Sequence, residues 1–198
     1  MSLKASYTLI APVYDALVRA PLERARAESL ASLPTSPPGT VLLNGIGTGL
    51  DLPHLPDAHE YVGIDLTSAM LRRAARVPVR RRVGFVQGDA TRLPFGDASF
   101  DHAVLHLILA IVPDPVACLR ETARVVRCGG TVLVLDKFLR PGQRARVRRA
   151  LTPIMGAIAT RLDVVFEEVR ARVPELVVES DRPGLAGGWF RFIRLRRM

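Results

Sequence analysis

From about residue 40 onward, short apolar runs alternate with helical patterns, and this alternation limits the fold more than any other feature of the chain. Five runs have the length and the β-branched content of strands: 40–44, 61–65, 83–87, 100–105 and 131–135. The last run is wholly apolar, as a central strand covered on both faces should be. Strands that alternate with helices form parallel sheets, so the pattern predicts an α/β fold.

Two helices between these strands have recognisable start signals. Thr67 can cap a helix whose apolar positions run to Ala74. Asp114 can cap a second helix, because Pro115 follows it and proline favours the first helical position. We expect this second helix to end at the glycine pair 129–130.

The composition is that of one globular domain. The chain has 198 residues, of which 48% are hydrophobic and 24% charged, and this balance excludes a disordered or a collagen-like chain. The formal net charge is +9, carried almost entirely by arginine, since Lys4 and Lys137 are the only lysines. A basic surface favours anionic partners such as a membrane surface, nucleic acid or acidic metabolites, without choosing among them.

Cysteine and histidine usage argues against a metal site or a disulfide framework. Cys118 and Cys128 form no paired motif, so we expect two buried thiols in a reducing compartment. His54 and His59 fall in a polar loop and are expected to be solvated. Residues 1–7 lack the pattern of a secretory signal, and the longest apolar run, 103–112, is shorter than the roughly 20 residues of a membrane span. These features predict a cytoplasmic protein.

The first strand runs into a glycine-rich loop, the segment 44–49 with the sequence NGIGTG. Glycines there let the backbone turn sharply and let a ligand approach the main chain. Asp65 ends the next strand about 20 positions after Gly45, where an acid can accept the ribose hydroxyls of a nucleoside.

The spacing of the loop favours a nucleoside without a pyrophosphate. A dinucleotide fingerprint would need a third glycine at position 50, but Leu50 stands there. Asp89, just after the third strand, could accept the exocyclic amine of an adenine, although it could also simply cap the turn that follows.

Together these motifs resemble a known family. The chain is similar to class I S-adenosylmethionine-dependent methyltransferases of the ubiquinone-biosynthesis-like group, methyltransferase type 11. The segment 11–15, APVYD, is also similar to the start of small phospholipid N-methyltransferases. The resemblance covers most of the chain and depends on the segments 41–49, 61–71, 88–90, 93–95, 99–101, 112–115 and 124–132.

The resemblance implies a Rossmann-like sheet of seven strands, mostly parallel, with an antiparallel last strand and helices on both faces. The implied cofactor is S-adenosyl-L-methionine, which leaves as S-adenosyl-L-homocysteine. Its implied contacts lie along one edge of the sheet: Asn44, Gly45, Gly47, Gly49, Asp65, Leu66, Asp89, Ala90 and His106.

Position 44 departs from the family pattern. The family usually has an acid there, near the amino acid end of the cofactor, and this chain has Asn44. A neutral amide still accepts a hydrogen bond from the ammonium but loses the charge-assisted part, roughly 1 kcal/mol or more. Asp51 is a candidate to compensate.

Methyl transfer from a sulfonium is an in-line displacement, so the protein must orient the acceptor and remove any proton that blocks its lone pair. His106 and Lys137, after the fourth and fifth strands, are the candidate catalytic residues, together with Tyr14 near the start. His106 could act as a base, or it could be a satisfied histidine on an apolar segment. Lys137 could bind a carboxylate or a phosphate, and an ionised carboxylate needs no base.

The ends of the chain are expected to close the site within one domain. The segments are a helical lid at 1–33, a cofactor-binding core at 40–138, a helical acceptor-side segment at 140–172 and a final strand pair at 175–198. The third segment begins with clustered arginines, followed by an apolar stripe. It could rest on an anionic membrane as a lid for an acyl chain, or pack on the sheet as an ordinary helix.

These observations predict methyl transfer to a small lipophilic or acidic acceptor. Two acceptors remain open: a fatty or hydroxy-fatty acid oriented by Lys137, and the amine of phosphatidylethanolamine deprotonated by His106. A protein that binds the cofactor without catalysis is the rival from another class. A nicotinamide reductase is disfavoured by Leu50 and by the absence of a Tyr-x-x-x-Lys pair, and nucleic acid by the lack of aromatics among the arginines.

Overall fold

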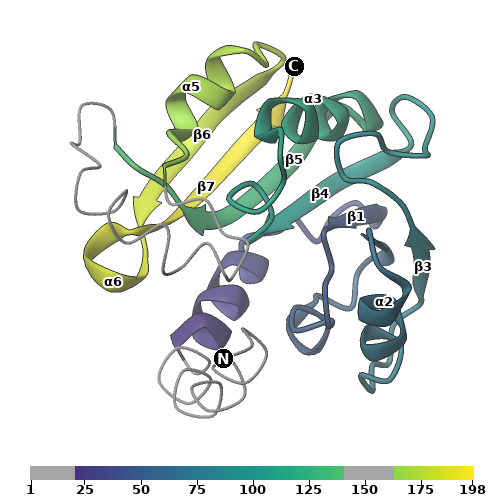
Figure 1. The fold of residues 1–198 in the computed structure, drawn as a ribbon. Helices are drawn as coiled ribbons and strands as arrows, with labels where there is room; N and C mark the ends of the chain where they lie inside the picture. The colour runs from purple at the N-terminus through teal and green to yellow at the C-terminus, as the bar shows by residue number, and fades with distance from the viewer. Residues whose placement is uncertain (1–20, 141–162) are drawn as a thin grey trace, which may run out of the picture.

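The computed structural model describes residues 21–140 and 163–198, and these form one sheet with helices on both faces (Figure 1). The sheet has seven strands in the order β3-β2-β1-β4-β5-β7-β6. Their bounds are β1 Thr40–Asn44, β2 Glu60–Asp65, β3 Val83–Gln87, β4 Phe100–His106, β5 Val126–Lys137, β6 Leu176–Pro183 and β7 Phe190–Arg197.

Six of the strands run in the same direction, and β7 runs antiparallel to both of its neighbours, β5 and β6. From β1 the strand order proceeds to one side through β2 and β3, and to the other side through β4 and β5. The loops after β1, β2 and β4 therefore lie together at the carboxyl ends of these strands. Ligands of open α/β sheets bind at such a switch point, beyond the carboxyl ends of the strands. The predicted Rossmann-like sheet with an antiparallel last strand is confirmed.

The predicted helix starts are confirmed, and one predicted helix end is wrong. The side chain of Thr67 accepts a hydrogen bond from Met70 N at the start of α2 (Ser68–Ala74), and Asp114 does the same for Ala117 N at α3 (Pro115–Val125). However, α3 ends at Val125, ahead of the glycine pair 129–130, because the chain enters β5 at once. The shorter helices are η1 (Leu52–His54), α5 (Phe166–Ala171) and α6 (Leu185–Gly188).

The glycine pair forms a bulge inside β5. Phe100 pairs with Val126 and His102 with Thr131, so residues 127–130 lie opposite the single residue Asp101. A Cβ at Gly130 would come within 2.4 Å of the Asp101 carbonyl oxygen, so only glycine fits there.

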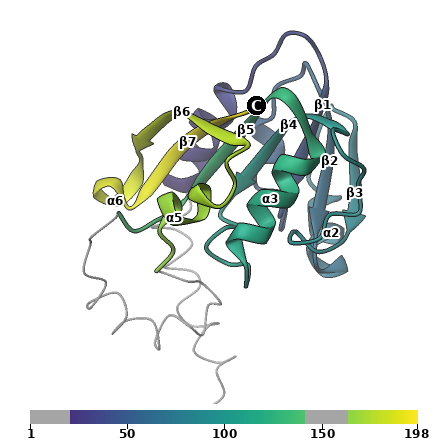
Figure 2. The same ribbon diagram turned by 90° about the horizontal axis from the view of Figure 1, so that it is seen from above.

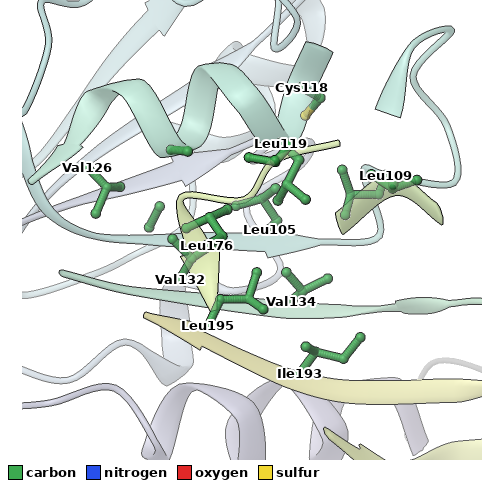
Figure 3. Close-up of a cluster of buried hydrophobic side chains, with 14 of the residues drawn as sticks. Leu105, Leu109, Cys118, Leu119, Val126, Val132, Val134, Leu176, Ile193 and Leu195 are labelled. Carbon is green, nitrogen blue, oxygen red and sulfur yellow. The ribbon is translucent and has the colours of Figure 1, made fainter. Parts of the chain in front are cut away.

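The two faces of the sheet are covered by different helices. In Figure 1, α3 and α5 lie above the sheet, while α2 and the helical residues 21–31 lie below it. Figure 2 shows the same layers from above. The face under α3 and α5 holds the larger apolar cluster (Figure 3), which includes Leu105, Leu109, Cys118, Leu119, Val126, Val132, Val134, Leu176, Ile193 and Leu195.

Two histidines are buried at the amino ends of the strands, and this corrects the prediction of a solvated His59. His59 is 5% exposed; its Nδ1 accepts from Gly39 N at 3.1 Å and its Nε2 lies 2.6 Å from the carbonyl of Pro34. The ring of His102 lies edge-on to it, and its Nδ1 accepts from Thr131 N at 3.1 Å. Burial lowers the pKa of His102 to about 4.

One of the two thiols also differs from expectation. Cys118, a residue of α3, is buried as predicted, and burial raises its pKa to about 12, whereas Cys128 is exposed in the bulge of β5. The described segments contain no helix that is long and apolar enough to cross a bilayer.

Candidate functional site

The loop after β1 takes a shape that only glycine adopts easily. Gly45, Gly47 and Gly49 have φ angles of 78°, 56° and 83°, in the left-handed region. Ile108, in the loop after β4, fills the space where a Cβ at Gly45 would stand, and its nearest atom would be 2.6 Å away. Apart from its chain neighbours, no atom of the described residues lies within 4 Å of a Cβ built at Gly47. The middle of the loop is therefore open to a ligand that approaches the backbone.

Asp65, at the end of β2, joins this loop to the start of α2. Its Oδ2 accepts from Gly47 N at 3.0 Å, and its Oδ1 accepts from the backbone N and the hydroxyl of Thr67 at 2.9 and 3.2 Å. The adjacent Leu66 is 67% exposed. The structure thus places a carboxylate next to the glycine loop, with an exposed apolar side chain beside it.

Asp89 follows β3, the neighbour of β2, and is exposed beside the half-buried Ala90. Its Oδ1 accepts from the backbone N and hydroxyl of Thr91 at 2.8 and 2.7 Å, and these hydrogen bonds lower the pKa of the carboxyl group. Asp89 is therefore ionised at neutral pH. None of the hydrogen bonds within the described segments uses its Oδ2, which leaves one oxygen for an amine donor.

Asn44 lies beneath the loop, turned toward α3. Its Nδ2 donates to the hydroxyl of Thr122 at 3.1 Å, and that hydroxyl donates in turn to the carbonyl of Cys118 at 2.9 Å. This chain of donors fixes the orientation of the amide, so Oδ1 is the atom left over. Oδ1 is buried and has no hydrogen-bond partner in the described parts of the chain. An unsatisfied buried acceptor at this position suits a cationic donor such as an ammonium.

His106 is buried, and both of its ring nitrogens have partners. It ends β4, and its side chain is 0% exposed. Its Nδ1 lies 2.7 Å from Asp51 Oδ1, and its Nε2 lies 3.0 Å from the hydroxyl of Ser29. With both ring nitrogens bonded, neither is open to take a proton from an acceptor in this arrangement. This geometry offers no open ring nitrogen for the predicted role of His106 as a base, and its predicted cofactor contact stays a prediction.

The acid bonded to His106 is held ionised by two partners. Burial alone would raise the pKa of Asp51, but His106 and Arg26 more than offset it and hold the pKa well below its usual range. Arg26 Nη1 lies 2.7 Å from the same Oδ1. Arg26 and Ser29 could not be identified from the sequence, because both lie on the helix 21–31, far from the glycine loop in the chain.

Asp136 and Lys137 end β5 at the same edge of the sheet. Asp136 is buried, and burial raises its pKa to about 6, although it accepts from Ala110 N at 3.0 Å and from Lys137 N at 2.8 Å. Lys137 is half-buried, and burial lowers its pKa. No hydrogen bond or ion pair joins its ammonium group to another described residue. Tyr14 and the arginines that follow residue 140 lie outside the described residues.

These residues fit a nucleoside with a free amino acid end. The open backbone at Gly47, the carboxylate of Asp65 and the free oxygen of Asp89 lie along adjacent strand ends, as a ribose and an adenine require. Asn44 directly precedes Gly45, and its Oδ1 has no hydrogen-bond partner in the described residues, although the residue is only 1% exposed. Nothing in this set requires a pyrophosphate.

Comparison with known proteins agrees with this geometry. The family described as "Methyltransferase domain" matches residues 42–134. The chain is 36% identical over 167 residues to a phosphatidylethanolamine N-methyltransferase of Cereibacter sphaeroides, covering 80% of each chain. It is 38% identical over 138 residues to a demethylmenaquinone methyltransferase of a Roseiflexus species, covering 66% of this chain but only 58% of that protein.

The fold is also similar to that of a geranyl diphosphate methyltransferase solved with S-adenosylmethionine. The TM-score is 0.69 at 16% identity, over 89% of this chain and 84% of the other. The sheet, the glycine loop with its two acids and the similarity to the Cereibacter protein lead to one assignment. The chain belongs to the type 11 family of class I methyltransferases, enzymes that use S-adenosylmethionine.

Proposed function

We propose that this enzyme methylates a small lipophilic acceptor that carries an anionic group, and that Lys137 holds this group. The observation that carries the proposal is the ammonium of Lys137, which is half-buried at the carboxyl end of β5 and has no hydrogen bond or ion pair with another described residue. A half-buried cation attracts a carboxylate or a phosphate more strongly than an exposed one, because water screens it less. The relatives' names also refer to lipophilic acceptors, a phospholipid and a quinone.

Bound S-adenosylmethionine would supply an electrophilic methyl group: the lone pair of the acceptor would attack the methyl carbon in line with the methyl–sulfur bond, and S-adenosylhomocysteine would leave as that bond breaks. We propose that the chain's own residues bind and orient the two reactants. Asp65 accepts from the ribose hydroxyls and Asp89 from the adenine amine, while Leu66 and Ala90 contact the base. The backbone of Gly45, Gly47 and Gly49 approaches the rest of the cofactor, and Asn44 Oδ1 accepts from its ammonium.

If the anionic group is a carboxylate, it is also the methylated group, and no base is needed. A carboxyl group with an ordinary pKa near 4 is fully ionised at neutral pH. Lys137 then has only to orient the carboxylate so that one oxygen lies in line with the methyl group.

A second candidate is the amine of a phosphatidylethanolamine head group, and the similarity to the Cereibacter enzyme favours it. Lys137 would then hold the phosphate of the head group. The ammonium must lose a proton before it can accept a methyl group, so this reaction needs a base. Both ring nitrogens of His106 are hydrogen-bonded, so the base would come from elsewhere, and Tyr14 is the candidate that the sequence singles out.

One experiment separates the two acceptors. The enzyme is incubated with methyl-labelled S-adenosylmethionine and an extract of lipids and organic acids, and the labelled product is then treated with base. Release of labelled methanol identifies a methyl ester and supports the carboxylate. A label that survives base identifies an N-, S- or ether-linked methyl group and excludes the carboxylate.

The variant Lys137→Ala tests the anchor itself. We expect it to abolish turnover of either anionic acceptor while leaving the binding of S-adenosylhomocysteine unchanged. Arg120→Ala is the matched control, because it removes an exposed cation on α3 whose hydrogen bond goes to the carbonyl of Arg172. Full turnover by Lys137→Ala would rule out the anchor.

We also propose that the enzyme contacts an anionic membrane surface peripherally to reach its acceptor. The net charge of +9 supports this, since basic surfaces bind anionic lipid in a salt-dependent way. Flotation with vesicles that contain phosphatidylglycerol, at low and high salt, tests it. Flotation at low salt only is the expected result, and the absence of flotation at low salt excludes the contact.

A further inference from the structure

A second group of polar side chains lies beside the edge of the sheet where the cofactor contacts are proposed, and the chemistry proposed above does not use this group. It consists of Arg26 and Ser29 on the helix 21–31, Asp51 just after the glycine loop, and His106 at the end of β4. Arg26 and His106 both contact the same oxygen, Asp51 Oδ1, at 2.7 Å. Ser29 bonds the far side of His106 at 3.0 Å.

This network is attached to the far end of the glycine loop. Asp51 is the residue before η1, and η1 follows the loop directly. Inside the loop, Gly49 N donates to Ile46 O and Leu52 N donates to Gly49 O, both at 3.1 Å. The near end of the loop is fixed by β1. Because Arg26 and His106 hold the carboxylate of Asp51 in place, Asp51 fixes the far end of the glycine loop.

The same network is attached to the loop after β4. Leu107, which follows His106, has a φ of 60°, an uncommon value for a leucine, and its N donates to Leu135 O at 2.8 Å. The next residue, Ile108, packs against Gly45. His106 thus holds the start of a segment that supports the glycine loop from a second side.

Burial makes the contact between Arg26 and Asp51 stronger than an ordinary surface pair. Their side chains are 10% and 6% exposed. The helix 21–31 also makes an ion pair with β6, between Glu28 and Arg182, but those side chains are 54% and 56% exposed and lie away from the loop. Removing one partner of a shielded pair leaves the other charge uncompensated, whereas an exposed pair contributes little.

We propose that Asp51 is a positioning residue for the cofactor loop, held between Arg26 and His106, so that the helix 21–31 sets the affinity for S-adenosylmethionine. The proposal extends the cofactor contacts proposed above to residues that do not touch the cofactor. It assigns Asp51, Arg26 and His106 a role in binding, with no part in proton transfer.

The first test uses the free protein and does not depend on any ligand. Amide hydrogen exchange is compared in Arg26→Gln and in the control Arg182→Gln, which loosens the same helix at its exposed pair. We expect exchange of the amides of residues 45–52 to become at least about tenfold faster in Arg26→Gln only. Equal exchange in the two variants would overturn the proposal.

The second test measures the dissociation constant of S-adenosylhomocysteine by calorimetry. We expect Arg26→Gln to weaken binding about tenfold, Arg26→Lys to restore most of it, and Arg182→Gln to bind as the unchanged protein does. If Arg26→Gln does not fold, Asp51→Asn replaces it, since it keeps the size of the side chain and loses the charge. Binding within twofold of the unchanged protein in folded Arg26→Gln or Asp51→Asn would refute the positioning role.

The two tests also separate this proposal from the cofactor contacts. An unchanged protein that binds no S-adenosylhomocysteine would contradict those contacts, whatever the exchange experiment shows. A protein that binds it, with loop exchange unaffected by Arg26→Gln, would contradict the positioning role alone.

Discussion

Alanine substitutions at Gly45 and Gly47 should have very different effects on stability, although both glycines lie in the same loop. Both have a positive φ, 78° and 56°, so each alanine pays a backbone strain of about 1 kcal/mol. At Gly45 the new Cβ would also lie 2.6 Å from Ile108 Cδ1 and 2.7 Å from its Cγ1. Overpacking of this kind adds roughly 1–3 kcal/mol.

We therefore expect Gly45→Ala to lower the free energy of unfolding by about 2–4 kcal/mol, and Gly47→Ala by about 1 kcal/mol. Urea unfolding followed by circular dichroism measures both. Adding Ile108→Ala to Gly45→Ala should recover part of the loss, because the clashing atoms are removed. The reasoning is refuted if the two glycine variants agree within about 0.5 kcal/mol, or if the double variant is less stable than the two single changes predict by addition.

Three further predictions concern positions away from the loop. His102 has a pKa of about 4 in the folded protein, so between pH 6.5 and 4 it takes up a proton mainly in the unfolded state. The free energy of unfolding should therefore fall by about 2–3 kcal/mol as the pH drops from about 6.5 to 4. Urea titrations of His102→Asn should show a weaker pH dependence. Ala98 is exposed with a φ of 53°, so Ala98→Gly should raise the free energy of unfolding by about 0.5 kcal/mol and the melting temperature slightly. A lower melting temperature in the variant would contradict the backbone strain at Ala98. A thiol reagent at pH 8 should modify Cys128 only, because Cys118 is buried and its pKa is raised to about 12. Mass spectrometry of the native protein checks this, and modification of Cys118 would contradict it.

Local signals in the sequence were sufficient for most of the fold. The strands 40–44 and 83–87 begin and end where the apolar runs predict, and the caps at Thr67 and Asp114 form as expected. The glycine pair 129–130 was misread because glycine serves equally well after a helix and in a bulge. Only the pairing of β5 with β4, which is not local, decides between the two.

The cofactor contacts were easier to predict than the network behind them. Glycines followed by an acid at the end of the next strand form a short-range pattern, and Gly47 and Asp65 do meet at 3.0 Å. His106 lies 77 residues from Ser29 and 55 from Asp51 along the chain, and no pattern in a single sequence links such positions. Its role could therefore be judged only once its neighbours were placed.

The position of β7 has a consequence for how this chain folds. β7 comes last in the sequence, yet it lies between β5 and β6 in the sheet (Figure 1). During synthesis, β6 therefore has no strand to pair with until residues 190–197 have left the ribosome. A chain that stops short of Phe190 would expose two unpaired strand edges, at β5 and β6, and such edges recruit strands from other molecules. Termination of synthesis before Phe190 should thus cause aggregation, whereas the loss of a strand at the edge of the sheet would be tolerated.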